Sequence, residues 1–111
     1  MYSKSTLFED QLATLAESAK ALAHPARLMI LQVLARRGTC ICGDIVNELP
    51  LAQASVSRHL KVLKEAGFIA GEVDGPRSCY CIDRKAIGRL RFQMESYLEA
   101  LPQEQCDPSC C

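Results

Sequence analysis

The sequence predicts a mainly α-helical domain that carries one small β-hairpin. Three observations predict this class: apolar residues recur at helical intervals through most of the chain, two short strand-like runs enclose Asp74-Gly75, and helical periodicity returns after the second run. The 111 residues are enough for one domain. With 49% hydrophobic and 23% charged residues, the composition is that of a globular protein rather than a disordered one.

The first helix is predicted to begin near Thr6 and Glu9, which have the spacing of a capping box. His24 ends it, because a residue before proline avoids helical geometry. Its apolar residues at helical intervals are Phe8, Leu12, Leu15, Ala19 and Leu22.

The second helix is predicted to begin at Pro25, which suits a first helical turn, and to extend to Arg37, where Gly38 stops it. Its apolar residues occur on more than one side, so we expect it to be buried. They are Leu28, Met29, Ile30, Leu31, Val33 and Leu34.

Two short helices follow, separated by a few residues. The third is predicted from Cys42 or Gly43 to Leu49, and the fourth from Gln53 to Ala66 with Gly67 as its C-cap. The fourth helix has an apolar face of Val56, Leu60 and Leu63 and is otherwise rich in Ser, Arg, His and Lys. This spacing is that of a helix-turn-helix.

The runs 69–73 and 78–82 are predicted to pair as a hairpin, after which Asp83 caps a last helix. The order predicts a winged helix-turn-helix domain, residues 1–101, with an added helix at each end, followed by a cysteine-containing tail, residues 102–111. The outer helices carry apolar stripes that the small central unit covers only in part. We therefore expect these helices to form the interface of a homodimer.

The chain contains the segments LAHPARL, residues 22–28, and LAQASVSRHLKVLKEAG, residues 51–67. Both closely resemble the ArsR/SmtB family of metal-responsive repressors. The segment CICGD, residues 40–44, resembles the Cys-x-Cys segment of arsenic- and cadmium-sensing members. The likeness covers roughly residues 10–101. It implies a homodimer that binds its operator without metal and releases it when a toxic ion binds.

The chain departs from the family pattern in three places. Ala52 and Ala54 stand where Ser and Pro are frequent, which weakens the helix N-cap. Ile45 replaces a third cysteine that some arsenic sensors have. The zinc-binding histidines of the last helix are missing, since His24 and His59 are the only histidines.

The fourth helix has side chains suited to DNA. Glutamine can hydrogen-bond to adenine, arginine can hydrogen-bond to guanine, and serine can contact either bases or phosphates. Residues 53–91 hold eight Lys or Arg and four acids, although charge alone fits a solvated surface equally well. Two such helices in a dimer predict a double-stranded, imperfectly palindromic operator. The predicted DNA-binding residues are Gln53, Ser55, Ser57, Arg58, Lys61, Lys64, Arg77 at the hairpin tip, and His59 in a structural or phosphate-contacting role.

Cys40 and Cys42 lie where the third helix is predicted to begin. In a regular helix such residues point about 200° apart, so they share an ion only if the chain around them is non-helical. An ion that takes both thiolates then fixes or distorts the start of the DNA-binding unit. The alternative is that both are small buried hydrophobic residues.

Two sulfurs hold a trivalent metalloid only weakly, so more thiolates are expected from Cys106, Cys110 and Cys111, in the same subunit or its partner. These three can equally form an independent site. Three thiolates favour As(III) or Sb(III), whereas four would admit Cd(II), Pb(II) or Zn(II). Cys79 and Cys81 are expected to face outward as incidental surface cysteines rather than as a second site or an oxidation-sensitive pair.

The sequence therefore predicts a repressor that senses As(III) or Sb(III). The alternatives are a sensor of Cd(II), Pb(II) or Zn(II), a thiol redox switch between Cys40 or Cys42 and a tail cysteine, and lastly a thiol oxidoreductase or metal carrier. The absence of a Cys-x-x-Cys motif argues against an enzyme. No membrane span or signal-like start occurs, so we expect a cytoplasmic protein, in which seven cysteines indicate metal or redox chemistry.

Overall fold

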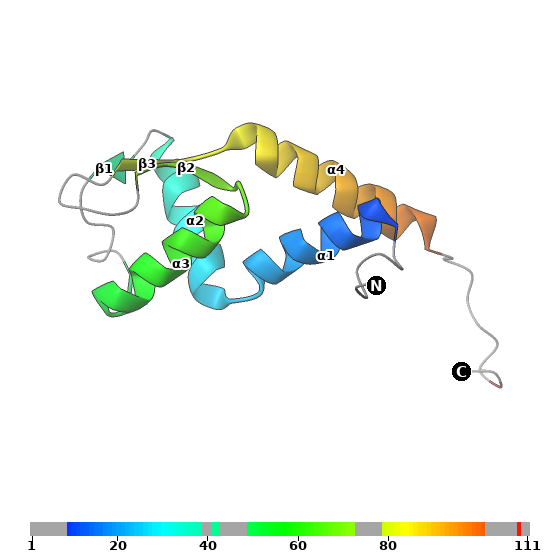
Figure 1. Ribbon diagram of the computed structural model, residues 1–111, viewed down its shortest axis with the longest axis horizontal. Coiled ribbons are helices and arrows are strands. Elements are labelled where there is room, and N and C mark those ends of the chain that lie inside the picture. Colours follow the sequence, from blue (N-terminus) through cyan, green and yellow to red (C-terminus); the bar gives the residue numbers. More distant parts are fainter. Residues whose placement is uncertain (1–8, 39–40, 43–48, 73–78, 102–108, 110–111) are drawn as a thin grey trace, which may run out of the picture.

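The computed structural model describes residues 9–38, 41–42, 49–72, 79–101 and 109. In chain order they form α1 (Asp10–Leu22), α2 (Pro25–Arg37), β1 (Ile41–Cys42), α3 (Gln53–Glu65), β2 (Ile69–Glu72), β3 (Cys79–Ile82) and α4 (Arg84–Ala100). α1 and α4 lie together at one end, and α2, α3 and the strands gather at the other (Figure 1). This confirms the predicted mainly helical class with an antiparallel hairpin.

The helix ends follow from local chemistry. α2 begins at Pro25 as predicted, and the Nδ1 atom of His24 accepts a hydrogen bond from the Ala26 amide at 3.0 Å. Helix α2 ends at Gly38, whose φ of 70° lies in the left-handed region, a conformation that glycine adopts without strain. Asp83 caps α4 as predicted, because its Oδ1 accepts from the Ala86 amide at 3.0 Å.

Two predicted helix boundaries are wrong by a few residues. α1 begins at Asp10, and Glu9 precedes it in an extended conformation without a side-chain cap bond, so Glu9 does not close a capping box. Thr6, the other half of that predicted box, lies outside the described residues. α3 ends at Glu65, and Gly67, with a φ of 87°, follows the cap residue instead of being it.

The sheet has three antiparallel strands in the order β1-β3-β2, so β3 is central. Ile41 pairs with Tyr80 and Cys42 with Cys79. The prediction that a helix begins at Cys42 is therefore wrong for Cys42 itself, and residues 43–48 lie outside the described residues. The cause is tertiary, because β1 provides hydrogen-bonding partners for an edge of β3 that would otherwise be unpaired.

The core unites all four helices and the sheet. Ile30, Val33 and Leu34 are buried, but Leu28 is 49% exposed, so the prediction that α2 is a buried helix does not hold on the side of Leu28. It lies two residues from Ile30, which is 0% exposed, and hence about 200° around the helix. The buried core cluster consists of Ala21, Ile30, Val33, Leu34, Leu49, Val56, Leu60, Leu63, Phe68, Ile69, Tyr80 and Ala86.

The outer helices keep large apolar side chains in contact with solvent, as their stripes predict. Phe92 is 71% exposed, Leu98 52% and Leu12 43%. A groove of about 730 Å³ runs between α1 and α4 and is lined in part by Leu12, Leu15, Phe92 and Tyr97. Within the described part of the chain, no helix is long and apolar enough to cross a membrane.

Candidate nucleic-acid interface and effector site

α3 presents a polar face because its apolar face is held in the core. Val56, Leu60 and Leu63 are 1%, 4% and 0% exposed. Of the predicted DNA-binding residues, Gln53, Arg58, Lys61 and Lys64 are exposed, Ser55, Ser57 and His59 are half-buried, and Arg77 lies outside the described residues. The helix thus carries three cations and one carboxylate, Glu65, away from the core.

Gln53, Ser57, Lys61 and Lys64 are spaced by four, four and three residues, so they follow one another along a single flank of α3. Arg58 lies beside this flank on the side opposite Val56. Ala52 precedes the helix and makes no side-chain cap bond, as the departure from the family pattern predicts. The arrangement is a row of donors and cations along one rigid helix, which suits contact with a DNA groove.

Arg27, in the first turns of α2, fixes the position of α3. Its Nη1 donates to the carbonyl oxygens of Lys20 and Ala21, at 3.2 and 3.1 Å, in the last turn of α1. Its Nε donates to Nδ1 of His59 on α3 at 3.2 Å. One guanidinium therefore connects three helices, and it satisfies two carbonyls at a helix C-terminus, where cations are favoured.

His59 is a positioning residue in this contact. Burial lowers the pKa of His59 from 6.5, and the positive charges of His24, Arg27 and Arg58 lower this pKa further. Its ring also lies against that of His24, with centroids 4.3 Å apart. A neutral His59 ring can accept the Arg27 bond, whereas a protonated ring cannot.

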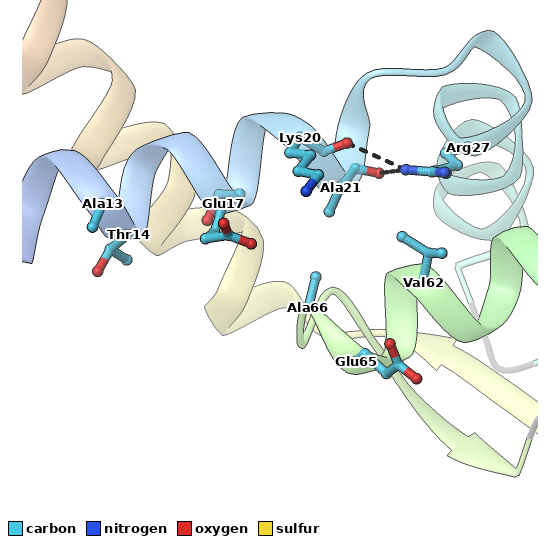
Figure 2. A pocket seen from close by; sticks show the side chains of 10 residues that line it. Ala13, Thr14, Glu17, Lys20, Ala21, Arg27, Val62, Glu65 and Ala66 are labelled. Carbon is cyan, nitrogen blue, oxygen red and sulfur yellow. Dashed lines mark hydrogen bonds between the residues drawn. The ribbon is translucent and has the colours of Figure 1, made fainter. Parts of the chain in front are cut away.

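A hollow of about 660 Å³ lies beside this contact, between α1 and α3. Figure 2 shows Lys20, Ala21 and Arg27 on one side of it and Val62 and Ala66 on the other. Sequence reasoning missed Arg27 as the link between the helices. The only signal was its place beside the His24-Pro25 helix break in the LAHPARL segment.

The described cysteines lie on neighbouring strands. Cys79 and Cys81 are half-buried and flank Tyr80, which is 2% exposed. Both are disulfide-bonded, so the expectation that they are incidental surface cysteines is wrong. Cys42 lies opposite Cys79 in the sheet. Cys40, Cys106, Cys110 and Cys111 lie outside the described residues.

The histidines and acids of the described region do not complete a metal site. No three His, Cys, Asp or Glu side chains gather into a metal-holding group in the part of the chain that the structure describes. Both histidines are engaged, because His24 accepts from the Ala26 amide and His59 from Arg27.

Comparisons with known proteins agree with this arrangement. A family model of a helix-turn-helix domain matches residues 22–72. An uncharacterized HTH-type transcriptional regulator of Methanocaldococcus jannaschii is 43% identical over 68 residues, which cover 60% of this chain and 75% of that protein. The arsenical resistance operon repressor of Bacillus subtilis is 32% identical over 93 residues, 83% of this chain and 85% of that one. The chain belongs to the ArsR/SmtB family of DNA-binding transcriptional repressors.

The ArsR/SmtB fold extends over nearly the whole chain. The solution structure of a homodimeric winged helix-turn-helix DNA-binding domain from Mycobacterium bovis, a possible ArsR-family regulator, has a TM-score of 0.60 and 21% identity, and the match covers 96% of each chain. In such a fold α3 is the second helix of the helix-turn-helix. These relatives are transcriptional regulators, and regulators of this kind are not enzymes.

Proposed function

We propose that this ArsR/SmtB protein is a homodimeric repressor that leaves its operator when As(III) or Sb(III) binds its cysteine thiolates, which derepresses metalloid-resistance genes. The observation that carries the proposal is the position of Cys42. It lies in β1, between α2 and α3 in the chain, and β1 pairs with strand β3 of the hairpin. An ion bound at Cys42 therefore acts on the hairpin and on the segment that leads to α3.

The proposed ligands are Cys40 and Cys42, with Cys106, Cys110 and Cys111 as further candidates. Cys42 lies in extended chain, and a non-helical segment is the condition under which Cys40 and Cys42 can share an ion. A ligand set of sulfur without histidine favours a soft trivalent ion. The name of the Bacillus subtilis relative, an arsenical resistance operon repressor, also supports a trivalent metalloid as the inducer.

The proposed DNA contacts are the polar residues of α3. Gln53 and Arg58 are suited to base edges, and Lys61 and Lys64, with Arg77 of the hairpin, to bases or phosphates. The exposed apolar residues of α1 and α4 support a dimer, and the Mycobacterium bovis domain is homodimeric. Two copies of α3 would then read the two halves of an imperfect palindrome.

The test compares Cys40→Ser and Cys42→Ser with the wild type in an operator-binding titration under reducing conditions. Both variants should bind the operator with unchanged affinity, because serine is similar in size to cysteine and lies outside α3. As(III) should release the wild type and neither variant. Induction retained in both variants would move the site away from this pair.

A thiol redox switch is the second candidate, and the disulfides of Cys79 and Cys81 favour it. In that case peroxide should release the operator from the reduced wild type, and As(III) should leave the complex intact. The two candidates therefore give opposite results in one titration.

A further inference from the structure

We propose that Arg27 is a positioning residue for operator binding, because its hydrogen bond to a neutral His59 sets the orientation in which α3 meets DNA. This role rests on the proposed function only in taking α3 as the helix that contacts the operator. It depends neither on the inducer nor on any cysteine. It makes operator affinity sensitive to one proton on His59 of each subunit.

The contact joins the end of α1 to the middle of α3. Arg27 Nη1 donates to the carbonyl oxygens of Lys20 and Ala21 at 3.2 and 3.1 Å, and its Nε donates to Nδ1 of His59 at 3.2 Å. The guanidinium is planar and rigid, so groups bound to its different nitrogens keep a fixed arrangement. Arg27 therefore holds α3 at a set distance and angle from the proposed dimer helix α1.

The packing between α1 and α3 makes this contact important. A hollow of about 660 Å³ separates the two helices, and Figure 2 shows Ala13 of α1 and Val62 and Ala66 of α3 around it. Close-packed side chains resist movement, whereas an open space between two helices does not. Arg27 also lines this hollow, so its bond to His59 restrains α3 where side-chain packing does not.

The place of His59 on α3 connects the contact to the DNA-facing side. His59 lies between Arg58, which is exposed, and Leu60, which is 4% exposed. Successive residues are about 100° apart around a helix, so His59 occupies the border between the polar face and the core face. A shift of α3 at this border moves Arg58 relative to a DNA groove.

A dimer would double the effect of such a shift. Two copies of α3 must fit successive major grooves, whose centres are about 34 Å apart, and the same error in each subunit changes their spacing twice. Contacts to base edges need this fit, whereas contacts to phosphates are found along any duplex. Loss of the Arg27 contact should therefore weaken operator binding more than binding to unrelated DNA.

The protonation state of His59 decides whether the contact exists. A neutral imidazole accepts the Arg27 bond at Nδ1, whereas a protonated ring has an N–H group there and cannot accept. A protonated ring would also place a second positive charge against the guanidinium. Both changes release α3 from Arg27.

The groups around His59 favour its neutral form. Burial is the largest cause that lowers the pKa of His59 below 6.5, and neighbouring positive charges lower it further. Operator affinity should therefore be complete at neutral pH and fall as the pH drops through this lowered pKa. The charged or titratable groups that act on His59 or line the hollow beside it are His24, Arg27, Arg58, Lys20, Glu17 and Glu65.

A direct phosphate contact by His59 predicts the opposite sign. A protonated imidazole binds a phosphate more strongly than a neutral one, so operator affinity would then rise on acidification. The direction of the pH dependence therefore separates a positioning role of His59 from a DNA contact.

The first measurement is operator anisotropy from about pH 7.5 to about pH 5.5, at constant salt, for the wild type and His59→Gln. Stoichiometric titration gives the active fraction, so unfolded protein does not distort the affinity. Wild-type affinity should fall, approaching about tenfold per pH unit for each subunit. Glutamine offers an acceptor oxygen that does not titrate, so His59→Gln should show no such fall. A flat or rising profile in the wild type, or an equal fall in His59→Gln, would overturn the proposal.

The second measurement is a double-mutant cycle at neutral pH. Arg27→Lys keeps the charge but lacks the fork, and His59→Leu lacks the acceptor. Each should weaken operator binding by about fivefold or more, and the double variant should bind no more weakly than the weaker single variant. Arg36→Lys, at an exposed position of α2, is the matched control and should bind like the wild type. Additive losses would overturn the proposal.

Urea midpoints of the same variants distinguish positioning from a purely structural role. If Arg27→Lys lowers the midpoint while its active fraction binds the operator with wild-type affinity, Arg27 only stabilises the fold, and the proposal is wrong.

Two α3 variants, Arg58→Ala and Lys61→Ala, separate this role from the proposed function. If both bind the operator like the wild type, α3 is not the DNA contact and both claims fail. If they lose affinity while the Arg27 and His59 variants do not, only the positioning role fails. If As(III) releases no operator but the cycle shows coupling, the positioning role stands and the proposed inducer is wrong.

Discussion

α3 and α4 both have an exposed face, but the two faces differ in chemistry. α3 has Val56, Leu60 and Leu63 in the core and places its cations in solvent. Only Ala86, in the first turn of α4, is fully buried, and farther along this helix Phe92 is 71% exposed. The apolar face of α3 is thus buried within its own chain, whereas much of the apolar face of α4 stays exposed.

The difference in chemistry indicates which kind of partner each helix face binds. A cationic face binds a polyanion such as DNA, and this binding weakens as salt rises. An apolar face is favoured by burial against another apolar surface, with little dependence on salt. Substitutions on the two helices should therefore be separable, because one set changes DNA binding and the other changes the oligomeric state.

The largest expected effect comes from removing the core anchor of α3. Leu63→Ala deletes a side chain that is 0% exposed, which should lower the free energy of unfolding by about 2–5 kcal/mol. Leu28→Ala is the matched control, because Leu28 is 49% exposed on α2 and its loss should cost under about 1 kcal/mol. Urea unfolding measures both. Equal losses would contradict the orientation of these helices.

The next effect concerns the apolar face of α4. Phe92→Asp should weaken the dimer by about 2 kcal/mol or more, roughly 30-fold in the dissociation constant, because a buried charge replaces an aromatic anchor. Sedimentation equilibrium gives this constant. Leu28→Asp places the same charge on an exposed leucine outside the groove and should leave association unchanged. If both variants dimerise like the wild type, the α1–α4 face is not the interface.

A smaller effect is expected on the α3 face. Arg58→Ala should cost about 1–3 kcal/mol of operator affinity if the guanidinium reads a base, and much less on unrelated DNA. Lys64→Ala should instead weaken binding to both DNAs alike and reduce the salt slope by about one. Anisotropy titrations at several salt concentrations distinguish these patterns. Unchanged operator affinity in Arg58→Ala would exclude a base contact.

The smallest effect is a pH dependence at the Arg27–His59 contact. The pKa of His59 in the folded protein lies below 6.5, chiefly through burial, so the unfolded chain binds this proton more readily. The contribution of His59 to stability is therefore complete above 6.5 and is lost as pH falls through the lowered folded pKa. His59→Gln should lose less stability than the wild type on acidification, as measured by urea midpoints. Parallel losses in the two proteins would contradict a lowered pKa.

The features that the sequence predicts well are those set by neighbouring residues. Pro25 and Gly38 delimit α2, Asp83 caps α4, and the spacing of Val56, Leu60 and Leu63 orients α3. Each depends on contacts within a few residues or on helical periodicity, so a local pattern is sufficient evidence for it.

The features that the sequence does not reveal depend on residues far apart in the chain. β1 has two residues and no strand pattern of its own, and its pairing with β3 joins Cys42 to a partner 37 positions away. Arg27 and His59 are 32 positions apart. The sequence alone does not show that Cys79 lies opposite Cys42 in the sheet, or that Cys79 and Cys81 are disulfide-bonded.

The central claim is that a thiophilic ion releases this repressor from DNA. The most direct test is the anisotropy of a labelled operator fragment bound by the reduced protein, titrated separately with As(III), Cd(II), Zn(II) and peroxide. Release by As(III) at about one ion per subunit, with Zn(II) without effect, is the result expected of a sulfur-only site. An operator complex that survives As(III) but dissociates with Cd(II) or peroxide would contradict the claim that the inducer is a trivalent metalloid.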